Sequence, residues 1–354
     1  MAAVGLMALA KSTSHFELAG SAQRKYVEAV HMVNSALESP TESLEDSTLM
    51  AVISLGVFEE ISDYKSWVIH VQGAAALLVA RGKEQFSSPM ALKLFNQVRT
   101  DLITACVNEN NPVPEDVLAL QDEGKGHQDV SSSFWQIGLV GARCAKLLTN
   151  FKGYNIEIVS DLLYEANTLE QEFGIFGQLL SLEEPYSTIQ DTAGRPDLIC
   201  HGRIGVYEDM WAIRIWNNWR NLLMIVCRVK LFLLNEILMN ALAPDNVGQT
   251  KLQLRDTMQL LAQLGEGILA TLPQAMKFQV TTYEDQTWND GASGLSSVAS
   301  AYLLAGRLSV VGQSEATNGE TRQWIIQRLT DISKSARIPT ALKIIEAIKG
   351  VDVQ

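Results

Sequence analysis

Apolar residues recur at spacings of three and four along almost the whole sequence. Side chains at these spacings share one face of an α-helix, whereas the alternation typical of a half-buried strand is hard to find over any useful length. The pattern therefore predicts an all-α, multi-helix globular protein without a substantial β-sheet. The helical segments expected from it are 2–12, 20–38, 47–61, 65–81, 89–107, 130–150, 156–181, 206–242, 250–271, 274–284, 291–312, 319–335 and 338–349.

The nine prolines all fall at or between these segments. Proline lacks an amide donor and clashes with the preceding turn, so helix interiors exclude it, and its placement supports the segmentation. Ser88 before Pro89 predicts an N-cap followed by proline at the first helical position. Arg81 before Gly82 predicts a helix end, with a cation near the last carbonyls and a glycine free to take the left-handed conformation.

A length of 354 residues allows one large domain or two smaller ones. Residues 183–205 contain two prolines and three glycines and interrupt the helical pattern. We expect a single domain over 1–354 in which 183–205 is a long loop. The alternative is that this loop joins an N-terminal half, 1–182, to a C-terminal half, 206–354.

The segment 206–242 is apolar on all sides, which predicts a long central helix covered by its neighbours. Its most apolar part, 222–242, is interrupted by charged side chains that include Arg228 and Lys230, so a buried core helix is favoured over a membrane span. A second non-helical stretch, 108–129, is acidic and polar.

The chain is 47% hydrophobic and carries a formal net charge of −12. This composition excludes a disordered protein, and the net negative charge without a basic block argues against direct nucleic-acid binding. The four cysteines are scattered, and the apolar residues 1–10 lack the basic start of a signal peptide. We therefore expect an intracellular protein without disulfides, which neither binds nucleic acid through this chain nor contacts a membrane.

Motifs for metals, phosphates and cofactors are missing from the sequence. The five histidines are far apart, no paired CxxC or HExxH occurs, and neither a P-loop nor a dinucleotide-binding glycine motif is present. We expect no metal and no cofactor. Asp290 lies in a fragment that resembles a diphosphate-binding motif, but helix capping explains it better. Ser293 resembles part of a nucleophile elbow, but the final glycine and a preceding strand are missing.

One group of side chains suggests acid–base chemistry. Glu59 and Glu60 precede His70 by a few helical turns, and such a pair can act as acid and base. Arg214 and Tyr283 are the candidate donors that would polarise a carbonyl group. A solvated acidic face and a hydrogen-bonded core histidine are the structural alternatives for the first group.

Aromatic residues are concentrated in the last part of the chain, where Trp216, Trp219 and Arg220 share a helix face that permits stacking. Such a stripe belongs to the core more often than to a ligand site. If a small-molecule pocket exists, amphipathic aromatic side chains and an arginine are what would line it. The candidates are Trp67, Trp211, Arg214, Trp216, Trp288 and Tyr302.

Three ordered groups of residues together resemble one known family. The segment Ser66–Gly82 (SWVIHVQGAAALLVARG) is similar to a signature of the fungal-specific transcription factor domain, which is the regulatory domain of zinc-cluster fungal regulators. Asp209–Arg220 (DMWAIRIWNNWR) looks like the long central helix of that family. The closing pattern is matched by Ala305–Arg307, Arg322–Ile325 and Ile338, Ala341 and Leu342.

The resemblance implies a regulatory, ligand-responsive domain, although the six clustered cysteines of the family's DNA-binding region are not found in this sequence. One hypothesis is therefore a transcription-factor-like domain without a DNA-binding module of its own, acting in the nucleus. The alternative is a stand-alone domain recruited to fungal secondary metabolism as a cofactor-free cyclase or isomerase in the cytoplasm, with a polyketide or terpenoid bound in a tryptophan-lined cavity. Enzyme status is left open.

Two kinds of partner follow from these hypotheses. One is an apolar small molecule, and the other is a homodimer or a heterodimer with a regulator. A third hypothesis is a pure interaction protein, which would require only a protein partner and no small molecule.

Overall fold

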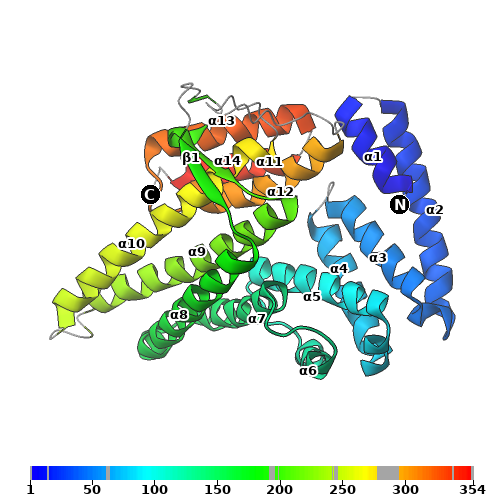
Figure 1. Ribbon diagram of the computed structural model, residues 1–354, viewed down its shortest axis with the longest axis horizontal. Helices are drawn as coiled ribbons and strands as arrows, with labels where there is room; N and C mark the ends of the chain where they lie inside the picture. The colour runs from blue at the N-terminus through cyan, green and yellow to red at the C-terminus, as the bar shows by residue number, and fades with distance from the viewer. Residues whose placement is uncertain are drawn as a thin grey trace. The chain divides into compact units, whose positions relative to one another are not determined.

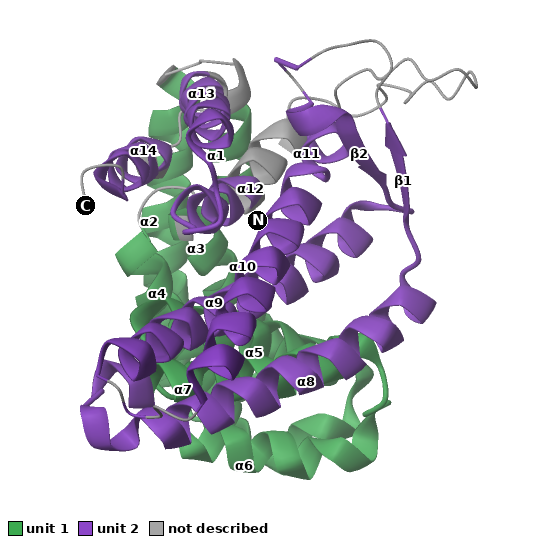
Figure 2. Ribbon diagram, turned by 90° about the vertical axis from the view of Figure 1, so that its left-hand side faces the viewer, with its two compact units in different colours: residues 1–149 green, residues 150–354 purple. Residues whose placement is uncertain are grey.

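The computed structural model describes residues 2–13, 16–60, 64–190, 196–197, 199–240, 242, 246–276, 295–336 and 339–351. By its internal contacts the chain divides into two compact units, residues 1–149 and 150–354, which Figure 2 shows in separate colours. Each unit is built almost entirely of helices. The prediction of an all-α, multi-helix protein is therefore confirmed, and the two described strands form one small sheet.

The first unit is a succession of helices in which each of the first four packs against the next along the chain (Figure 1). Its helices are α1 Ala2–Thr13, α2 Phe16–Glu38, α3 Asp46–Glu60, α4 Tyr64–Arg81, α5 Pro89–Glu109, α6 Glu115–Gly124 and α7 Ser133–Lys152, which runs past the unit boundary. Short 3₁₀ turns lie at Glu42–Leu44, Lys83–Ser87 and Lys125–His127.

The first unit is held together at one point by a buried arginine. Arg99 of α5 is 1% exposed and lies over the ring of Trp135, with its Cζ 4.1 Å from the ring centroid. Its guanidinium donates to Gln121 Oε1 at 3.0 Å and to the Phe134 carbonyl at 3.3 Å. Because Gln121 lies on α6 and Trp135 on α7, this one side chain joins three helices.

The second unit is arranged around α9, which packs against α8, α10 and α12. Its helices are α8 Val159–Glu183, α9 Met210–Met239, α10 Val247–Leu269, α11 Leu272–Ala275, α12 Leu295–Gly312, α13 Gly319–Ala336 and α14 Pro339–Val351. Short 3₁₀ turns lie at Ile156–Ile158 and Cys200–Gly202. The long central helix expected within 206–242 is therefore present as α9, most of whose apolar side chains are buried.

A two-stranded antiparallel hairpin precedes α9. Strand β1, Ser187–Gln190, pairs with β2, Arg203–Val206, in a register that places Ile189 opposite Ile204. Ile204 is buried together with Ile199, and Ile189 packs against both. The sequence predicted only a long loop over these residues, because four-residue strands are too short to show clear alternation.

The local signals at helix ends are mostly confirmed. Ser88 is the N-cap of α5 and accepts a hydrogen bond from the amide of Ala91 at 3.3 Å, with Pro89 following it. Helix α4 ends at Arg81, and Gly82 follows with a φ of 61°.

Helix α6 was not expected, because it lies in the polar stretch 108–129 and its buried residues, Val117, Leu120, Gln121 and Gly124, include only two that are strongly apolar. The helix expected at 274–284 falls mostly outside the described residues, as do Asp290 and Ser293.

None of the helices in the described part of the chain combines the length and apolarity that a membrane-spanning helix requires.

The packing of Arg99 predicts a large effect for one glycine. A Cβ on Gly138 would lie 2.6 Å from Arg99 Cζ, whereas a Cβ on Gly73, another helical glycine of this unit, would meet nothing within 4 Å. We expect Gly138→Ala to lower the free energy of unfolding by about 2 kcal/mol through overpacking. Gly73→Ala should leave it unchanged or raise it by about 0.5–1 kcal/mol. Urea unfolding followed by circular dichroism measures both, and equal effects would contradict the packing described.

Candidate functional site

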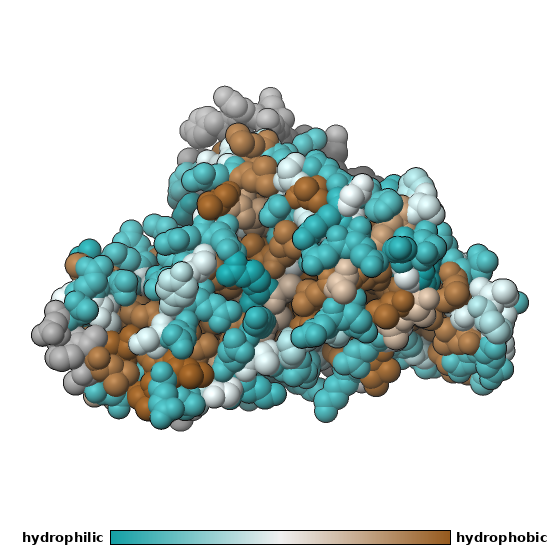
Figure 3. All heavy atoms as spheres, turned by 90° about the horizontal axis from the view of Figure 1, so that it is seen from below, coloured by the Kyte–Doolittle hydropathy of each residue, from teal (hydrophilic) through white to brown (hydrophobic). Residues whose placement is uncertain are grey.

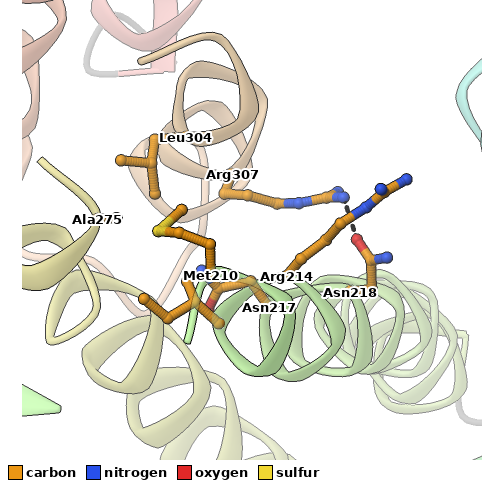
Figure 4. Close-up of a pocket in the computed structure, with 8 residues that line it drawn as sticks. Met210, Arg214, Asn217, Asn218, Ala275, Leu304 and Arg307 are labelled. Carbon is orange, nitrogen blue, oxygen red and sulfur yellow. Dashed lines mark hydrogen bonds between the residues drawn. The ribbon is translucent and has the colours of Figure 1, made fainter. Parts of the chain in front are cut away.

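The second unit contains a pocket between α9, α11 and α12. It has a volume of about 330 Å³, which includes space open to solvent. Its apolar lining comes from Met210, Ile213, Ala275 and Leu304, and its polar lining from Arg214, Asn217, Asn218 and Arg307. Figure 4 shows the arginine side chains of α9 and α12 running toward Asn218, while Met210 and Leu304 lie at the other end. The pocket is therefore amphipathic, with an apolar end and a cationic end.

The lining of this pocket, as far as the structure describes it, contains two guanidinium groups and no carboxylate. Arg307 donates a hydrogen bond to Asn218 Oδ1, which fixes the direction of its side chain. Arg214 and Asn218 are one helical turn apart on α9, so their side chains reach the same end of the pocket. Guanidinium groups in this arrangement offer several N–H donors to one anionic group.

The floor of the pocket is held by a buried hydrogen-bond network. Asn217 is 3% exposed; its Nδ2 donates to Thr271 Oγ1 at 3.0 Å, and its Oδ1 accepts from Arg220 at 3.1 Å. Thr271 in turn donates to the carbonyl of Ile268 at 2.7 Å. These bonds join α9 to the end of α10, so Asn217 presents one fixed surface to the pocket.

Arg220 lies behind this floor and is 2% exposed. Its guanidinium donates to the Tyr207 hydroxyl at 2.8 Å, and its Cζ lies 5.3 Å, 5.7 Å and 5.2 Å from the ring centroids of Tyr186, Tyr207 and Trp216. These partners, together with Asn217, are all neutral. Burial raises the pKa of Tyr207 to about 12, although the neighbouring Arg220 opposes the shift, so the hydroxyl stays protonated. A cation–π contact with each ring replaces part of the lost hydration of the cation.

Helix α10 packs directly against the Arg220 guanidinium at Gly267. A Cβ on Gly267 would lie 2.7 Å from Arg220 Nε, so only glycine leaves room for the guanidinium. Gln274 of α11 holds the main chain of Tyr207 in place. Its Oε1 accepts from the amide of Tyr207 and its Nε2 donates to the carbonyl of Tyr207, both at 2.8 Å.

Of the residues expected to form a ligand site, Arg214 lines the pocket. Trp216 is not among the lining residues. It is buried in the aromatic group around Arg220, and its indole N–H donates to the carbonyl of Glu184 at 2.7 Å. Trp211 is 41% exposed and is not among the lining residues.

Several other candidates cannot be placed. Tyr283 and Trp288 lie outside the described residues, as do the side chains of Glu60 and Tyr302.

The remaining acid–base candidates lie in the first unit. His70 Nε2 is 3.2 Å from the hydroxyl of Tyr26, and Tyr26 stacks on Phe58 with ring centroids 4.4 Å apart. Burial raises the pKa of Tyr26, and a hydrogen bond to Glu59 adds to the shift. Burial lowers the pKa of His70, and the charge of Glu59 opposes this. Trp67, also expected in a ligand site, is 5% exposed and packs in this unit.

The pocket is suited to holding an anion more than to moving a proton. Its described polar side chains are arginines and asparagines, and none of them is a residue type that commonly acts as a general acid or base. Within the described residues, no three His, Cys, Asp or Glu side chains converge on a metal position.

The cysteines offer no activated nucleophile. Burial raises the pKa of Cys106 to about 11 and the pKa values of Cys144, Cys200 and Cys227 to about 12. All four thiols are therefore protonated near pH 7, and the thiolate is the reactive form.

Of the residues that line the pocket, only Arg214 was expected from the sequence. The others were missed: Met210, Ile213, Asn217, Asn218, Ala275, Leu304 and Arg307. Arg307 was noted only as part of the closing pattern of the family. Nothing in the linear pattern connects it to Arg214, because the two arginines lie on helices that are far apart in the sequence. Their meeting depends on how α12 packs against α9.

Residues 1–105 match the model of the fungal specific transcription factor domain. The match covers α1 to α4 and most of α5, and it confirms the resemblance for this part of the chain. The pocket of the second unit lies outside the matched residues. No curated protein and no solved structure matches the sequence.

The shifted pKa of His70 predicts a pH dependence. Because burial holds this pKa below its usual 6.5, the unfolded chain binds a proton more readily than the folded chain. The contribution of His70 to stability is therefore complete above about pH 6.5 and is lost as the pH falls below that value. We expect His70→Gln to flatten the dependence of the free energy of unfolding between pH 7 and pH 5, measured by urea titrations. An unchanged slope would contradict this.

Proposed function

We propose that this protein is a regulatory domain of a fungal transcription regulator and that the pocket of its second unit binds a small molecule. The family match over residues 1–105 supports the regulatory role. In that role the protein acts in the nucleus, together with the regulator whose activity it controls. The observation that supports the ligand proposal is Arg214 at one end of a pocket whose other end is lined by Met210 and Leu304.

The lining defines the class of ligand. A carboxylate or a similar anionic group would accept hydrogen bonds from Arg214, whose side chain runs toward the same end of the pocket as Asn218. The apolar remainder of the ligand would contact Met210 and Leu304 at the other end of the pocket. An acidic polyketide or terpenoid has this combination of an apolar skeleton and one anionic group. The pocket is small and open to solvent, so much of the ligand would lie outside it.

Binding at this position would affect more than the pocket itself. The lining residues come from both α9 and α12, so a bound ligand would contact these two helices at once. Helix α12 also packs against α13 and α14. A ligand that binds the folded form would therefore stabilise the arrangement of the helices in this unit, which is the kind of change that a regulatory domain can pass on.

The cyclase or isomerase alternative has less support. The described lining supplies hydrogen-bond donors, which can polarise a carbonyl, but no side chain that acts as an acid or base near pH 7. The acid–base candidates His70 and Glu59 belong to the other unit. The chemistry of the pocket therefore favours binding over catalysis.

Decanoate is a suitable probe, because it joins an apolar chain to one carboxylate, and decanol is its neutral counterpart. We expect decanoate to bind the protein and to raise its melting temperature. Arg214→Met should weaken decanoate binding about tenfold, since one charge-assisted contact is lost. The same variant should leave the weaker binding of decanol nearly unchanged. Isothermal titration calorimetry measures the affinities, and thermal unfolding measures the shift.

Arg255→Met is the matched control, because Arg255 is an exposed arginine of α10 that is not among the lining residues. Its affinity for decanoate should equal that of the wild type. If Arg214→Met binds decanoate as tightly as the wild type does, or if decanol binds as tightly as decanoate, the proposed anion site is wrong.

A further inference from the structure

Helix α8 buries one face against its neighbour. Its buried side chains include Leu162, Leu169, Phe173 and Leu180, and this helix packs against α9. Two polar contacts fix the pairing: Trp219 of α9 donates to the carbonyl of Phe173 at 2.9 Å, and Lys230 of α9 pairs with Glu170 at 2.7 Å.

The opposite face of α8 carries a line of exposed apolar residues. Tyr164 is 75% exposed, Ile175 is 70% exposed and Leu182 is 81% exposed. Their spacings of 11 and 7 residues are close to whole numbers of helical turns, so the three side chains lie along one line. The line is about 27 Å long at 1.5 Å per residue. Large apolar side chains aligned in this way are typical of a helix that packs against another helix.

The charge beside this line has one sign. Asp161, Glu165, Glu172 and Glu183 follow one another at spacings of 4, 7 and 11, so they form a parallel acidic line along one flank. Residues 153–190 contain seven acidic residues and no lysine, arginine or histidine. The exposed face of α8 is therefore apolar and is flanked by carboxylates.

We propose that the exposed face of α8 is a docking surface for a basic amphipathic helix of a partner protein. The apolar side of that helix would cover Tyr164, Ile175 and Leu182, and its lysines or arginines would lie opposite Asp161 and Glu165. This inference is independent of the pocket, because it uses different residues of the same unit.

Charge distinguishes this partner from a second copy of the chain. Two α8 faces brought together would place acidic lines close to each other, and like charges across an interface oppose association. A basic helix would instead be attracted by the same carboxylates. A single helix face is smaller than a stable dimer interface requires, so the contact should be reversible, with a dissociation constant on the order of micromolar.

A designed peptide tests the surface directly. The probe is a fluorescein-labelled amphipathic helix of about 21 residues with leucines at matching spacings and lysines along one flank, and its counterpart carries glutamates in place of the lysines. We expect the full-length protein to bind the lysine peptide and not the glutamate peptide in fluorescence polarisation. Ile175→Ser combined with Leu182→Ser should weaken binding about tenfold, and so should Asp161→Lys combined with Glu165→Lys.

Met239→Ser is the matched control. Met239 is 82% exposed and is the last residue of α9. Other exposed apolar residues, Leu242 and Val247, follow it up to the start of α10, and Figure 3 shows apolar side chains in brown near the left-hand end of the molecule. This variant should bind the lysine peptide within about twofold of the wild type, because it leaves the α8 face unchanged. Circular dichroism confirms that each variant is folded. The proposal is overturned if the wild type does not bind, if the α8 double variants bind as tightly as the wild type, or if sedimentation shows a dimer that Ile175→Ser with Leu182→Ser dissociates.

Discussion

The buried guanidinium of Arg220 is the interaction on which the pocket of the second unit depends. A buried cation is costly unless its N–H groups are hydrogen-bonded. Here Asn217, the Tyr207 hydroxyl and three aromatic rings satisfy it, and all of these partners are neutral. These contacts also hold Asn217 in place, and Asn217 lines the pocket.

The first unit also contains a buried arginine whose contacts join several helices. Arg99 is buried against Trp135 and donates to an amide oxygen and to main-chain carbonyls, and Gly138 leaves it room. Burial lowers the pKa of Arg99 to about 10, so the guanidinium is still charged near pH 7. In both units a large cation specifies the packing of several helices, because its donors find acceptors on different elements.

The positions of most helices and several helix ends could be predicted from the sequence, because they depend on local patterns. The spacing of apolar residues predicted α9, and Ser88 and Gly82 marked the ends of their helices. The hairpin β1–β2 and α6 were missed, since each is too short for its pattern to stand out.

The candidate site could be predicted only in part. The stacking of Arg220 on Trp216 was expected from their spacing, and Arg214 was expected in a site. The sequence did not predict that Arg214 and Arg307 line the same pocket, because only the packing of α12 on α9 brings them together.

The central claim is that Arg214 contacts an anion while Arg220 lies fixed behind the floor of the pocket. The ¹⁵Nε–¹Hε signals of these two side chains, assigned by substitution and followed during a titration with decanoate, test it most directly. We predict that the Arg214 signal shifts with saturating behaviour and that the Arg220 signal moves little. A titration in which the Arg214 signal does not move, or in which Arg220 responds first, would contradict it.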